Sequence, residues 1–198
     1  MSRGHDLRCQ RCGLSEPLCV CAEARPQATR TEIIIVRHAQ ERAKSSNTGR
    51  LATLALHRAT LLEHGAPEAP LDADSLARPG TWLLFPEGPA LASPPSPPPE
   101  RLIVLDGTWH QARRMRQRIA ALRGLPVLNL PPGPDRPRMR RAPRAGHMAT
   151  IEAIAAALQL VDEPTAAAAL LDLYDLVVDR TARSRHTSAA LASERANE

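Results

Sequence analysis

The segment IVLDGTWHQARRM (residues 103–115) places an acidic side chain at the end of a hydrophobic run. Asp106 closes that run and is followed by Gly107, Thr108 and Trp109. In open α/β sheets, ligands bind at the carboxyl ends of the strands. Asp106 is therefore a candidate general base. It could instead bind a hydroxyl or amino group of a substrate, or orient a nucleobase. The alternative is that Asp106 or Thr108 only caps the helix that follows.

Trp109 is one of two tryptophans in a chain that is only 2% aromatic. At the start of a helix beside a cleft it could form an apolar wall against a bound base. The alternative is a core tryptophan that braces the turn between strand and helix. The sequence leaves both interpretations open.

All four cysteines lie within residues 9–21, in the pattern C-x2-C-x6-C-x-C. In a reducing compartment such a cluster favours metal binding over disulfides. Four thiolates on tight turns satisfy tetrahedral zinc and leave no open position, so the ion would be structural rather than catalytic. Four free thiols are the alternative. The predicted zinc ligands are Cys9, Cys12, Cys19 and Cys21.

Basic residues are concentrated in one segment of a chain whose formal net charge is +5. Residues 101–144 hold eleven arginines and no lysine against two aspartates, a local net charge of +9. Concentrated positive charge indicates a phosphate-binding surface. A compositional explanation is the alternative, because the whole chain prefers arginine and Lys44 is its single lysine. The candidate RNA-backbone contacts are Arg113, Arg114, Arg116 and Arg118 on a predicted helix, and Arg138, Arg140, Arg141 and Arg144 in a predicted loop.

Short apolar segments alternate with helical patterns along the chain, which predicts an α/β fold with a mostly parallel sheet. The expected strands are 32–36, 81–85, 101–105 and 126–130, and the expected helices are 50–64, 109–122, 150–160 and 164–178. We divide the chain into a zinc knuckle with its linker (1–30), an α/β domain (31–180) and a flexible polar tail (181–198).

Nothing in the sequence predicts a membrane protein. No segment approaches the roughly 18 apolar residues of a transmembrane helix, and the first eight residues lack the apolar core of a signal peptide. We therefore expect a cytoplasmic protein, which is either a monomer or a homodimer.

Four segments resemble the DTW-domain family. Asp106-Gly107-Thr108-Trp109 resembles its D-x-T-W signature, and SSNTGRL (45–51) resembles its Ser/Thr-Asn-Thr-Gly-Arg-Leu segment. ATIEAIAAAL (149–158) is similar to a late Thr-x-Glu-Ala motif, and the cysteine pattern matches that of bacterial members. The resemblance covers residues 8–178 in the family's order. One departure is HAQE (38–41), which lacks the proline of the usual His-Pro-x-Glu.

The resemblance implies a tRNA-uridine aminocarboxypropyltransferase. Such an enzyme moves the 3-amino-3-carboxypropyl group of S-adenosylmethionine (SAM) to N3 of a tRNA uridine, giving acp3U and methylthioadenosine. It also implies a fold related to SPOUT methyltransferases, with a C-terminal knot. The residues expected to bind SAM are Asn47, Thr48, Gly49, Arg50, Thr108, Trp109, Thr150 and Glu152.

A base near the uridine would help, because N3 holds its proton at neutral pH. Asp106 is the first candidate, and His38, Glu41 and Glu152 are lesser ones. Glu152 has an alternative role as a first-turn acid that the helix dipole stabilises.

Two other functions stay open. A SAM-dependent RNA methyltransferase would use the same cleft with SAM turned around. A non-catalytic zinc-containing RNA-binding module would explain the cysteines and arginines but would leave Asp106 and Thr150 without a role. The scarcity of aromatic residues argues against a stacking platform for single strands, so recognition of RNA shape and phosphate is expected.

Overall fold

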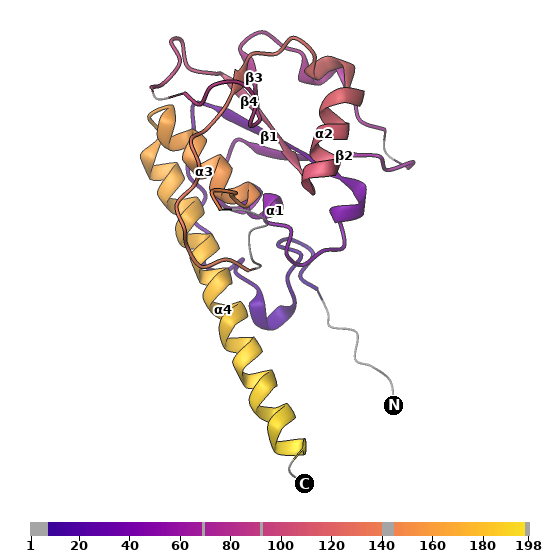
Figure 1. The fold of residues 1–198 in the computed structure, drawn as a ribbon, viewed down its shortest axis with the longest axis vertical. Helices are drawn as coiled ribbons and strands as arrows, with labels where there is room; N and C mark the ends of the chain where they lie inside the picture. The colour runs from indigo at the N-terminus through magenta and orange to yellow at the C-terminus, as the bar shows by residue number, and fades with distance from the viewer. Residues whose placement is uncertain (1–7, 69, 92, 140–144, 197–198) are drawn as a thin grey trace.

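The computed structural model describes residues 8–196 apart from 69, 92 and 140–144, and its central element is a parallel sheet (Figure 1). The order of the five strands is β2-β1-β4-β3-β5, and each pair of neighbours is parallel. This confirms the α/β prediction. The strands are β1 (Glu32–His38), β2 (Ala59–His64), β3 (Thr81–Leu84), β4 (Arg101–Asp106) and β5 (Val127–Leu128).

Helices cover both faces of the sheet (Figure 1). On one face lie α1 (Gly49–Ala55), α3 (Thr150–Leu160) and α4 (Pro164–Ala196), and on the other lies α2 (Trp109–Arg118). Short 3-10 turns complete the structure: η1 (Glu16–Leu18), η2 (Ala39–Glu41), η3 (Asp74–Leu76) and η4 (Ala120–Leu122).

The central strands β1 and β4 are apolar on both faces, as expected for a parallel sheet covered on both sides. Ile33 and Ile35 of β1 pack in the core with α1, α3 and α4, whereas Ile34 and Val36 pack in the core with α2. Leu14 of the cysteine-containing segment joins the first of these cores and is almost fully buried. The division of the chain into domains stays a prediction.

The helix predicted over 50–64 is wrong in its second half. Helix α1 ends at Ala55, and residues 59–64 form the edge strand β2 beside β1. Leu61 and Leu62 alternate between the two cores, which is the period of a strand. Their spacing from Leu51 and Leu54 also fits a helix, so the sequence pattern alone did not separate the two.

The C-terminal segment also differs from the sequence prediction. The helix is expected over 164–178, but α4 continues to Ala196, through most of the segment expected as a flexible tail, and extends beyond the body of the protein (Figure 1). The segment 181–196 is rich in alanine and arginine and has no glycine or proline, so its residues favour a helix. In the described part of the chain we find no helix with the length and hydrophobicity of a membrane span.

Glu163 ties the segment that precedes β1 to the start of α4. Its two carboxylate oxygens accept hydrogen bonds from the backbone N–H groups of Arg30 (2.9 Å) and Thr31 (3.0 Å). The Arg30 guanidinium in turn donates to the carbonyl of Asp162 (2.9 Å). Glu163 is buried, so water does not replace these bonds.

Replacing Glu163 with Ala should lower the free energy of unfolding by about 2–4 kcal/mol, because the buried N–H of Thr31 and the partly buried N–H of Arg30 lose their acceptors. Glu163→Gln keeps one acceptor oxygen and should lose less. The measurement is urea unfolding followed by circular dichroism. The exposed Asp172 of α4 provides the control, since Asp172→Ala should change stability by less than about 0.5 kcal/mol. Equal losses for Glu163→Ala and Asp172→Ala would contradict the role of Glu163.

Candidate active site

Three segments that are far apart in the sequence meet at the carboxyl edge of the sheet. Asp106 ends β4, Asn47 lies just before α1, and Thr150 begins α3. The Asn47 side-chain amide donates a hydrogen bond to Asp106 Oδ2, and the Thr150 hydroxyl donates to Oδ1 at 2.7 Å. Each residue comes from a different sequence motif, so the fold brings the motifs into one cluster.

The Asp106 carboxyl is 3% exposed, and this burial raises its pKa. The hydrogen bonds from Thr150 and Asn47 and the positive charge of Arg37 act in the opposite direction, because they stabilise the carboxylate. Asp106 does not cap α2. The site therefore contains a desolvated carboxyl group whose charged form has specific partners.

Arg37 belongs to a row of charged side chains across three neighbouring strands. Glu63 of β2, Arg37 of β1 and Asp106 of β4 are in register. Arg37 is buried and forms an ion pair with Glu63. This row places a positive charge beside Asp106 in a region with little water, where Coulomb interactions are strong.

Gly49 explains why α1 can approach Asp106 so closely. A β-carbon at this position would lie 2.7 Å from Asp106 Oδ2 and 3.2 Å from Ile35 Cγ2. The glycine thus lets the start of α1 cover the carboxylate.

Two cavities, each of about 460 Å³, adjoin at this edge. We call the first the apolar pocket, because the described residues that line it include no Asp, Glu, Lys or Arg. The second, the Asp106 pocket, is lined by charged and polar groups, among them Glu41, Asp106 and Arg138, together with apolar side chains such as Met139 and Met148. The residues that line the apolar pocket include Leu84, Phe85, Val104, Asn129, Leu130, Pro131, Pro132 and Ala153. The residues that line the Asp106 pocket include Glu41, Asn47, Thr48, Asp106, Thr108, His110, Arg138 and Tyr174.

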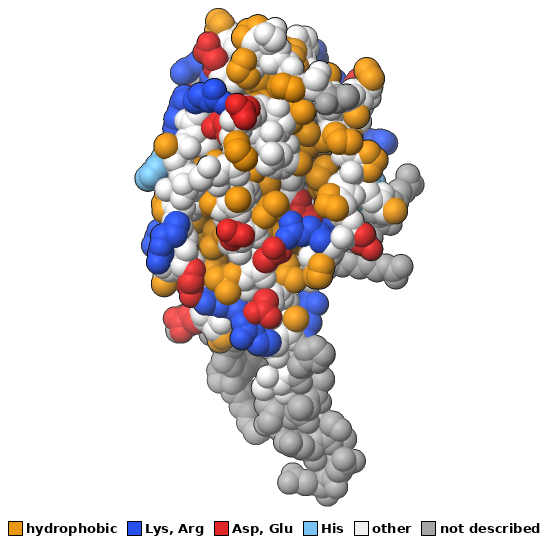
Figure 2. Space-filling view, turned by 90° about the vertical axis from the view of Figure 1, so that its left-hand side faces the viewer, with side chains coloured by type: hydrophobic (Ala, Val, Ile, Leu, Met, Phe, Trp, Pro, Cys, Tyr) orange, Lys and Arg blue, Asp and Glu red, His pale blue; other side chains and the backbone are white. Residues whose placement is uncertain are grey.

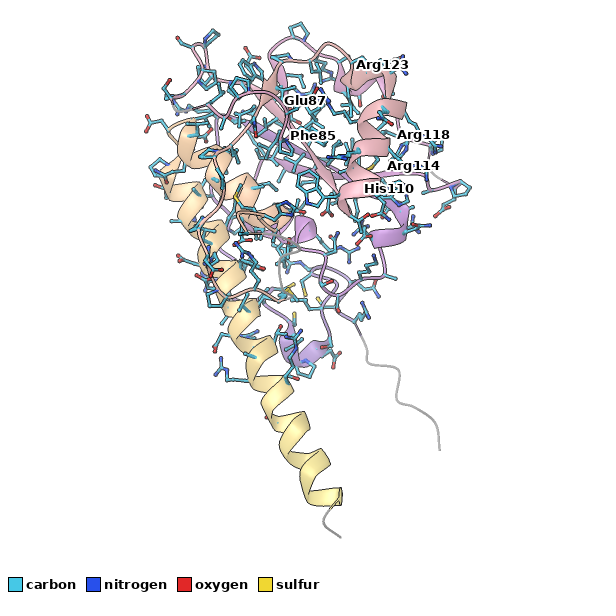
Figure 3. All side chains as sticks on the ribbon, viewed as in Figure 1. Phe85, Glu87, His110, Arg114, Arg118 and Arg123 are labelled. Atoms are coloured by element: carbon cyan, nitrogen blue, oxygen red, sulfur yellow. The ribbon has the colours of Figure 1, made fainter. Side chains whose placement is uncertain are left out.

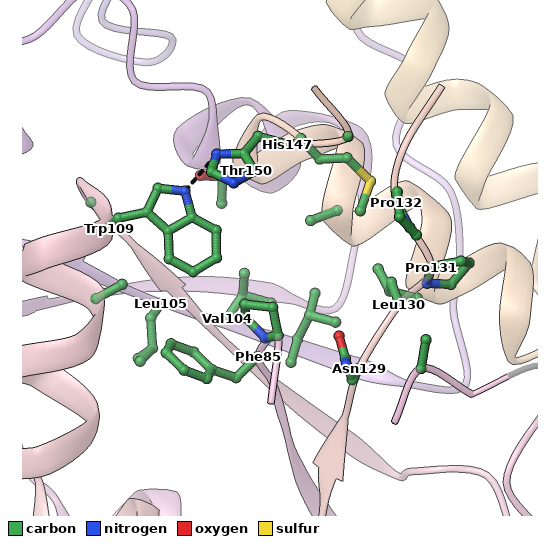
Figure 4. A pocket seen from close by; sticks show the side chains of 18 of the residues that line it. Phe85, Val104, Leu105, Trp109, Asn129, Leu130, Pro131, Pro132, His147 and Thr150 are labelled. Atoms are coloured by element: carbon green, nitrogen blue, oxygen red, sulfur yellow. Dashed lines mark hydrogen bonds between the residues drawn. The ribbon is translucent and has the colours of Figure 1, made fainter. Parts of the chain in front are cut away.

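Trp109, His147 and Thr150 line both pockets and so stand at their boundary (Figure 4). The Trp109 indole N–H donates a hydrogen bond to His147 Nδ1 at 2.9 Å, and the ring centroids are 5.0 Å apart. Trp109 is 39% exposed. The core-tryptophan alternative is therefore wrong, and Trp109 forms a wall of the cleft.

Several predicted residues have local structural roles. Thr108 is the N-cap of α2, and its hydroxyl accepts a hydrogen bond from the Gln111 N–H. The capping alternative is thus confirmed for Thr108, which also lines the Asp106 pocket. Thr48 stands at the N-cap of α1, and its hydroxyl accepts from the N–H of Ile151 in α3 (3.4 Å). Thr48 thereby joins α1 to α3 beneath the site.

Glu152 and Arg50 point to other neighbours. Glu152 is buried, accepts from the backbone N–H of Ala149 (2.6 Å) and pairs with Arg138 (2.8 Å), so it closes the first turn of α3. Arg50 reaches Gly13 of the cysteine segment and is absent from the described residues that line the two pockets.

The other two lesser base candidates, Glu41 and His38, also differ in position. Glu41 lines the Asp106 pocket but forms an ion pair with Lys44 (2.6 Å). His38 accepts a hydrogen bond from the Gln40 N–H at 3.3 Å.

The predicted arginines fall into distinct groups. Arg113, Arg114 and Arg118 are exposed on α2, whereas Arg116 pairs with Glu87 and lies 5.0 Å from the Phe85 ring centroid. Arg138 is held by Glu152 at the Asp106 pocket. The remaining predicted contacts, Arg140, Arg141 and Arg144, lie outside the described residues.

The four cysteines form one cluster in which all Sγ atoms lie within 4.8 Å of one another. Cys9 and Cys21 are 3.6 Å apart, and Cys12 and Cys19 are 3.8 Å apart. These are not disulfide distances, and the structure has them as free thiols. A tetrahedral zinc ion with bonds of about 2.3 Å keeps its sulfurs about 3.8 Å apart. The cluster therefore fits a tetrahedral metal ion.

Local groups act on these thiols in opposite ways. The backbone N–H groups of Cys12 and Arg11 lower the pKa of Cys9 to about 6, whereas burial raises the pKa of Cys12 and of Cys21. Arg180 of α4 donates to the Cys19 carbonyl and pairs with Glu23. The cluster is thus attached to the long C-terminal helix.

Sequence reasoning missed two residues of this site. Arg37 closes the apolar run of β1 just as Asp106 closes that of β4, so the signal that found Asp106 was also present there. His147 lies three residues before Thr150 in a loop without periodicity, and no pattern in the sequence pointed to it.

The chain is similar to a known protein family over most of its length. The DTW domain matches residues 6–182. The chain belongs to the DTW domain family. The match includes all four cysteines and the three segments that meet at Asp106.

One curated relative is the tRNA-uridine aminocarboxypropyltransferase A of Arabidopsis thaliana, which is 32% identical to this chain over 133 residues. The aligned region is 54% of this chain and 49% of the relative, so the chain spans about half the length of the curated relative that it matches. No solved structure matches this DTW-domain chain.

Replacing Gly49 with Ala should lower the free energy of unfolding by about 1–3 kcal/mol, because the new methyl group overlaps the Asp106 carboxylate. The same substitution in an Asp106→Ala background should cost clearly less. Chemical unfolding of the two single variants and the double variant gives this coupling. Additive losses would mean that the Gly49 substitution acts elsewhere than at Asp106.

Proposed function

We propose that this DTW-domain protein transfers the 3-amino-3-carboxypropyl group of SAM to N3 of a tRNA uridine. The family and the name of the Arabidopsis relative support this reaction class. The observation that carries the proposal is the convergence of Asp106, Asn47 and Thr150 where two pockets adjoin.

The two pockets suit two different substrates. The volume of each falls within the roughly 300–1,000 Å³ typical of small-molecule sites. The apolar pocket suits the adenosine and the methyl group attached to sulfur, because its described lining is largely hydrophobic and contains no Asp, Glu, Lys or Arg. The Asp106 pocket suits the uracil, which needs polar partners and a proton acceptor. Trp109 and Thr150 at the boundary would then lie beside the reacting atoms.

SAM supplies an electrophilic carbon next to its positively charged sulfur. In the proposed reaction a bond forms between that carbon and N3, and the carbon–sulfur bond breaks with its electron pair left on sulfur. The N3 proton goes to the Asp106 carboxylate. A carboxyl group whose pKa is raised by burial is a better proton acceptor than an exposed one, while Thr150 and Asn47 keep it oriented.

Orientation of SAM decides which of its carbons reacts. Holding the reacting atoms in line supplies much of the rate in such a transfer. The hydrogen-bonded Trp109–His147 pair, which lines both pockets, would keep the methyl group on the apolar side and expose the amino-acid arm to the uracil.

The proposal also includes a structural zinc ion held by Cys9, Cys12, Cys19 and Cys21. Four thiolates fill its coordination sphere, so the ion would hold the N-terminal segment against α4 and take no part in the transfer. The relation to SPOUT methyltransferases with a C-terminal knot, and a cytoplasmic location, remain parts of the proposal that rest on the sequence.

The decisive assay incubates purified protein with unmodified tRNA transcripts and SAM labelled either in its carboxyl group or in its methyl group. Carboxyl label should enter tRNA, and methyl label should leave as methylthioadenosine. The Asp106→Asn variant should lose at least about 100-fold in rate while it still binds tRNA. Methyl label in tRNA would instead indicate a methyltransferase, and intact binding without either label would indicate a binding module.

Stability measurements show whether Asp106→Asn is folded. Because burial raises the Asp106 pKa, the folded state binds this proton more tightly, and the resulting stabilisation is present at acidic pH and lost as pH rises through the folded pKa. Asparagine is neutral at every pH, so the Asp106→Asn variant avoids that loss. It should be at least as stable as the wild type at pH 7, and the difference in free energy of unfolding should narrow toward pH 4. Asn47 Oδ1, buried without a partner among the described residues, can accept from the new amide.

Metal analysis tests the cysteine cluster. The purified protein should contain one zinc ion per chain, and Cys12→Ser should remove it and lower the melting temperature. Glu23→Gln, which perturbs the ion pair with Arg180 but leaves all four thiols, should keep the metal. A metal-free protein whose four thiols react freely with a disulfide reagent would contradict the zinc site.

A further inference from the structure

The outer face of α2 carries a line of basic and polar side chains. Ala112 and Met115 face the core, while His110, Arg114 and Arg118 are exposed. These three follow one another at intervals of four residues, so they lie along one side of the helix. Figure 3 shows them in succession along α2. We call them the α2 stripe.

No acidic side chain in the described part of the chain pairs with the α2 stripe. Among the described residues, no ion pair or hydrogen bond engages the side chains of His110, Arg114 or Arg118, and α2 itself contains no acid. Arg116 differs, because it pairs with Glu87 and its guanidinium lies over the Phe85 ring. The stripe therefore does not stabilise the fold through its charges.

The opposite side of the molecule is arranged differently. On the face that α4 covers, basic and acidic side chains are interspersed (Figure 2), and their contacts include Arg136 with Asp175 and Arg183 with Asp179. Opposite charges there neutralise each other. Charge complementarity thus favours an anionic partner at α2 rather than at α4.

The α2 stripe begins at the candidate active site. His110 lines the Asp106 pocket and directly follows Trp109. With a rise of about 1.5 Å per residue, the distance from His110 to Arg118 along the helix is about 12 Å, enough to reach more than one phosphate of a nucleic acid strand. The stripe thus runs outward from the place where a uracil would bind.

We propose that the α2 stripe binds the phosphates on one side of the substrate uridine and so guides the RNA strand into the Asp106 pocket. This inference rests on the proposed function. Arginine is suited to phosphate because its planar fork can donate two parallel hydrogen bonds. Such contacts position the strand without reading its sequence. Trp109, exposed at the start of the stripe, then lies beside the base that is turned out of the strand.

The experiment measures binding of a fluorescently labelled, unmodified tRNA transcript over a series of salt concentrations. Arg114→Ala and Arg118→Ala should each weaken binding several-fold and reduce the slope of log K against log salt by about 0.7–0.9. The double variant should lose about twice as much slope. The matched control is Arg78→Ala, since Arg78 is an exposed arginine near the amino edge of the sheet, and it should leave the slope unchanged.

Two further readouts separate a phosphate contact from a structural effect. The double variant Arg114→Lys with Arg118→Lys should keep most of the salt slope, because lysine keeps the positive charge. In the transfer assay, Arg114→Ala should raise KM for tRNA and leave kcat nearly unchanged. An unchanged slope in the double variant, or equal losses in Arg78→Ala, would overturn the proposal.

These outcomes are distinguishable from failure of the proposed reaction. Reduced slopes in a protein that transfers no label would keep the stripe as an RNA-binding surface and reject the transferase. Label transfer with unchanged slopes would keep the transferase and reject the stripe.

Discussion

The buried Asp106 carboxyl group governs how the elements around it are placed. A desolvated carboxylate is costly unless donors surround it, and here the donors come from the start of α1 and of α3. Both helices must therefore begin at the carboxyl edge of the sheet and at a close distance. Gly49 permits that distance, and Thr48 fixes the two helices to each other through Ile151.

The charged Asp106 that the proposed reaction needs is not the form that burial favours. Burial makes the folded chain more stable with a neutral Asp106 than with a charged one. Arg37 on the neighbouring strand acts in the opposite direction, because its positive charge stabilises the carboxylate. Arg37 is in turn held by Glu63 on β2. The edge strand β2 thereby contributes to the electrostatics of a site that it does not line, which gives it a role beyond completing the sheet.

The two ends of the chain support this arrangement from outside the sheet. The cysteine cluster packs through Leu14 into the core shared by α1, α3 and α4, and Arg180 joins it to α4. Arg50, which immediately follows Gly49, reaches Gly13 of the same segment. A metal ion in the cluster would thus act on the active site indirectly, by fixing the helix whose start covers Asp106.

Local patterns and short motifs in the sequence were enough to predict the α/β class, the strand that ends in Asp106, the cysteine cluster and the family. The sequence did not determine that 59–64 is a strand, since Leu61 and Leu62 fit both periods and only pairing with β1 decides between them. It also could not show that Trp109 meets His147, that Arg37 faces Asp106, or that Glu152 serves α3 and Arg138 rather than the pocket. These facts depend on contacts between residues far apart in the chain, and only the tertiary structure brings such residues together.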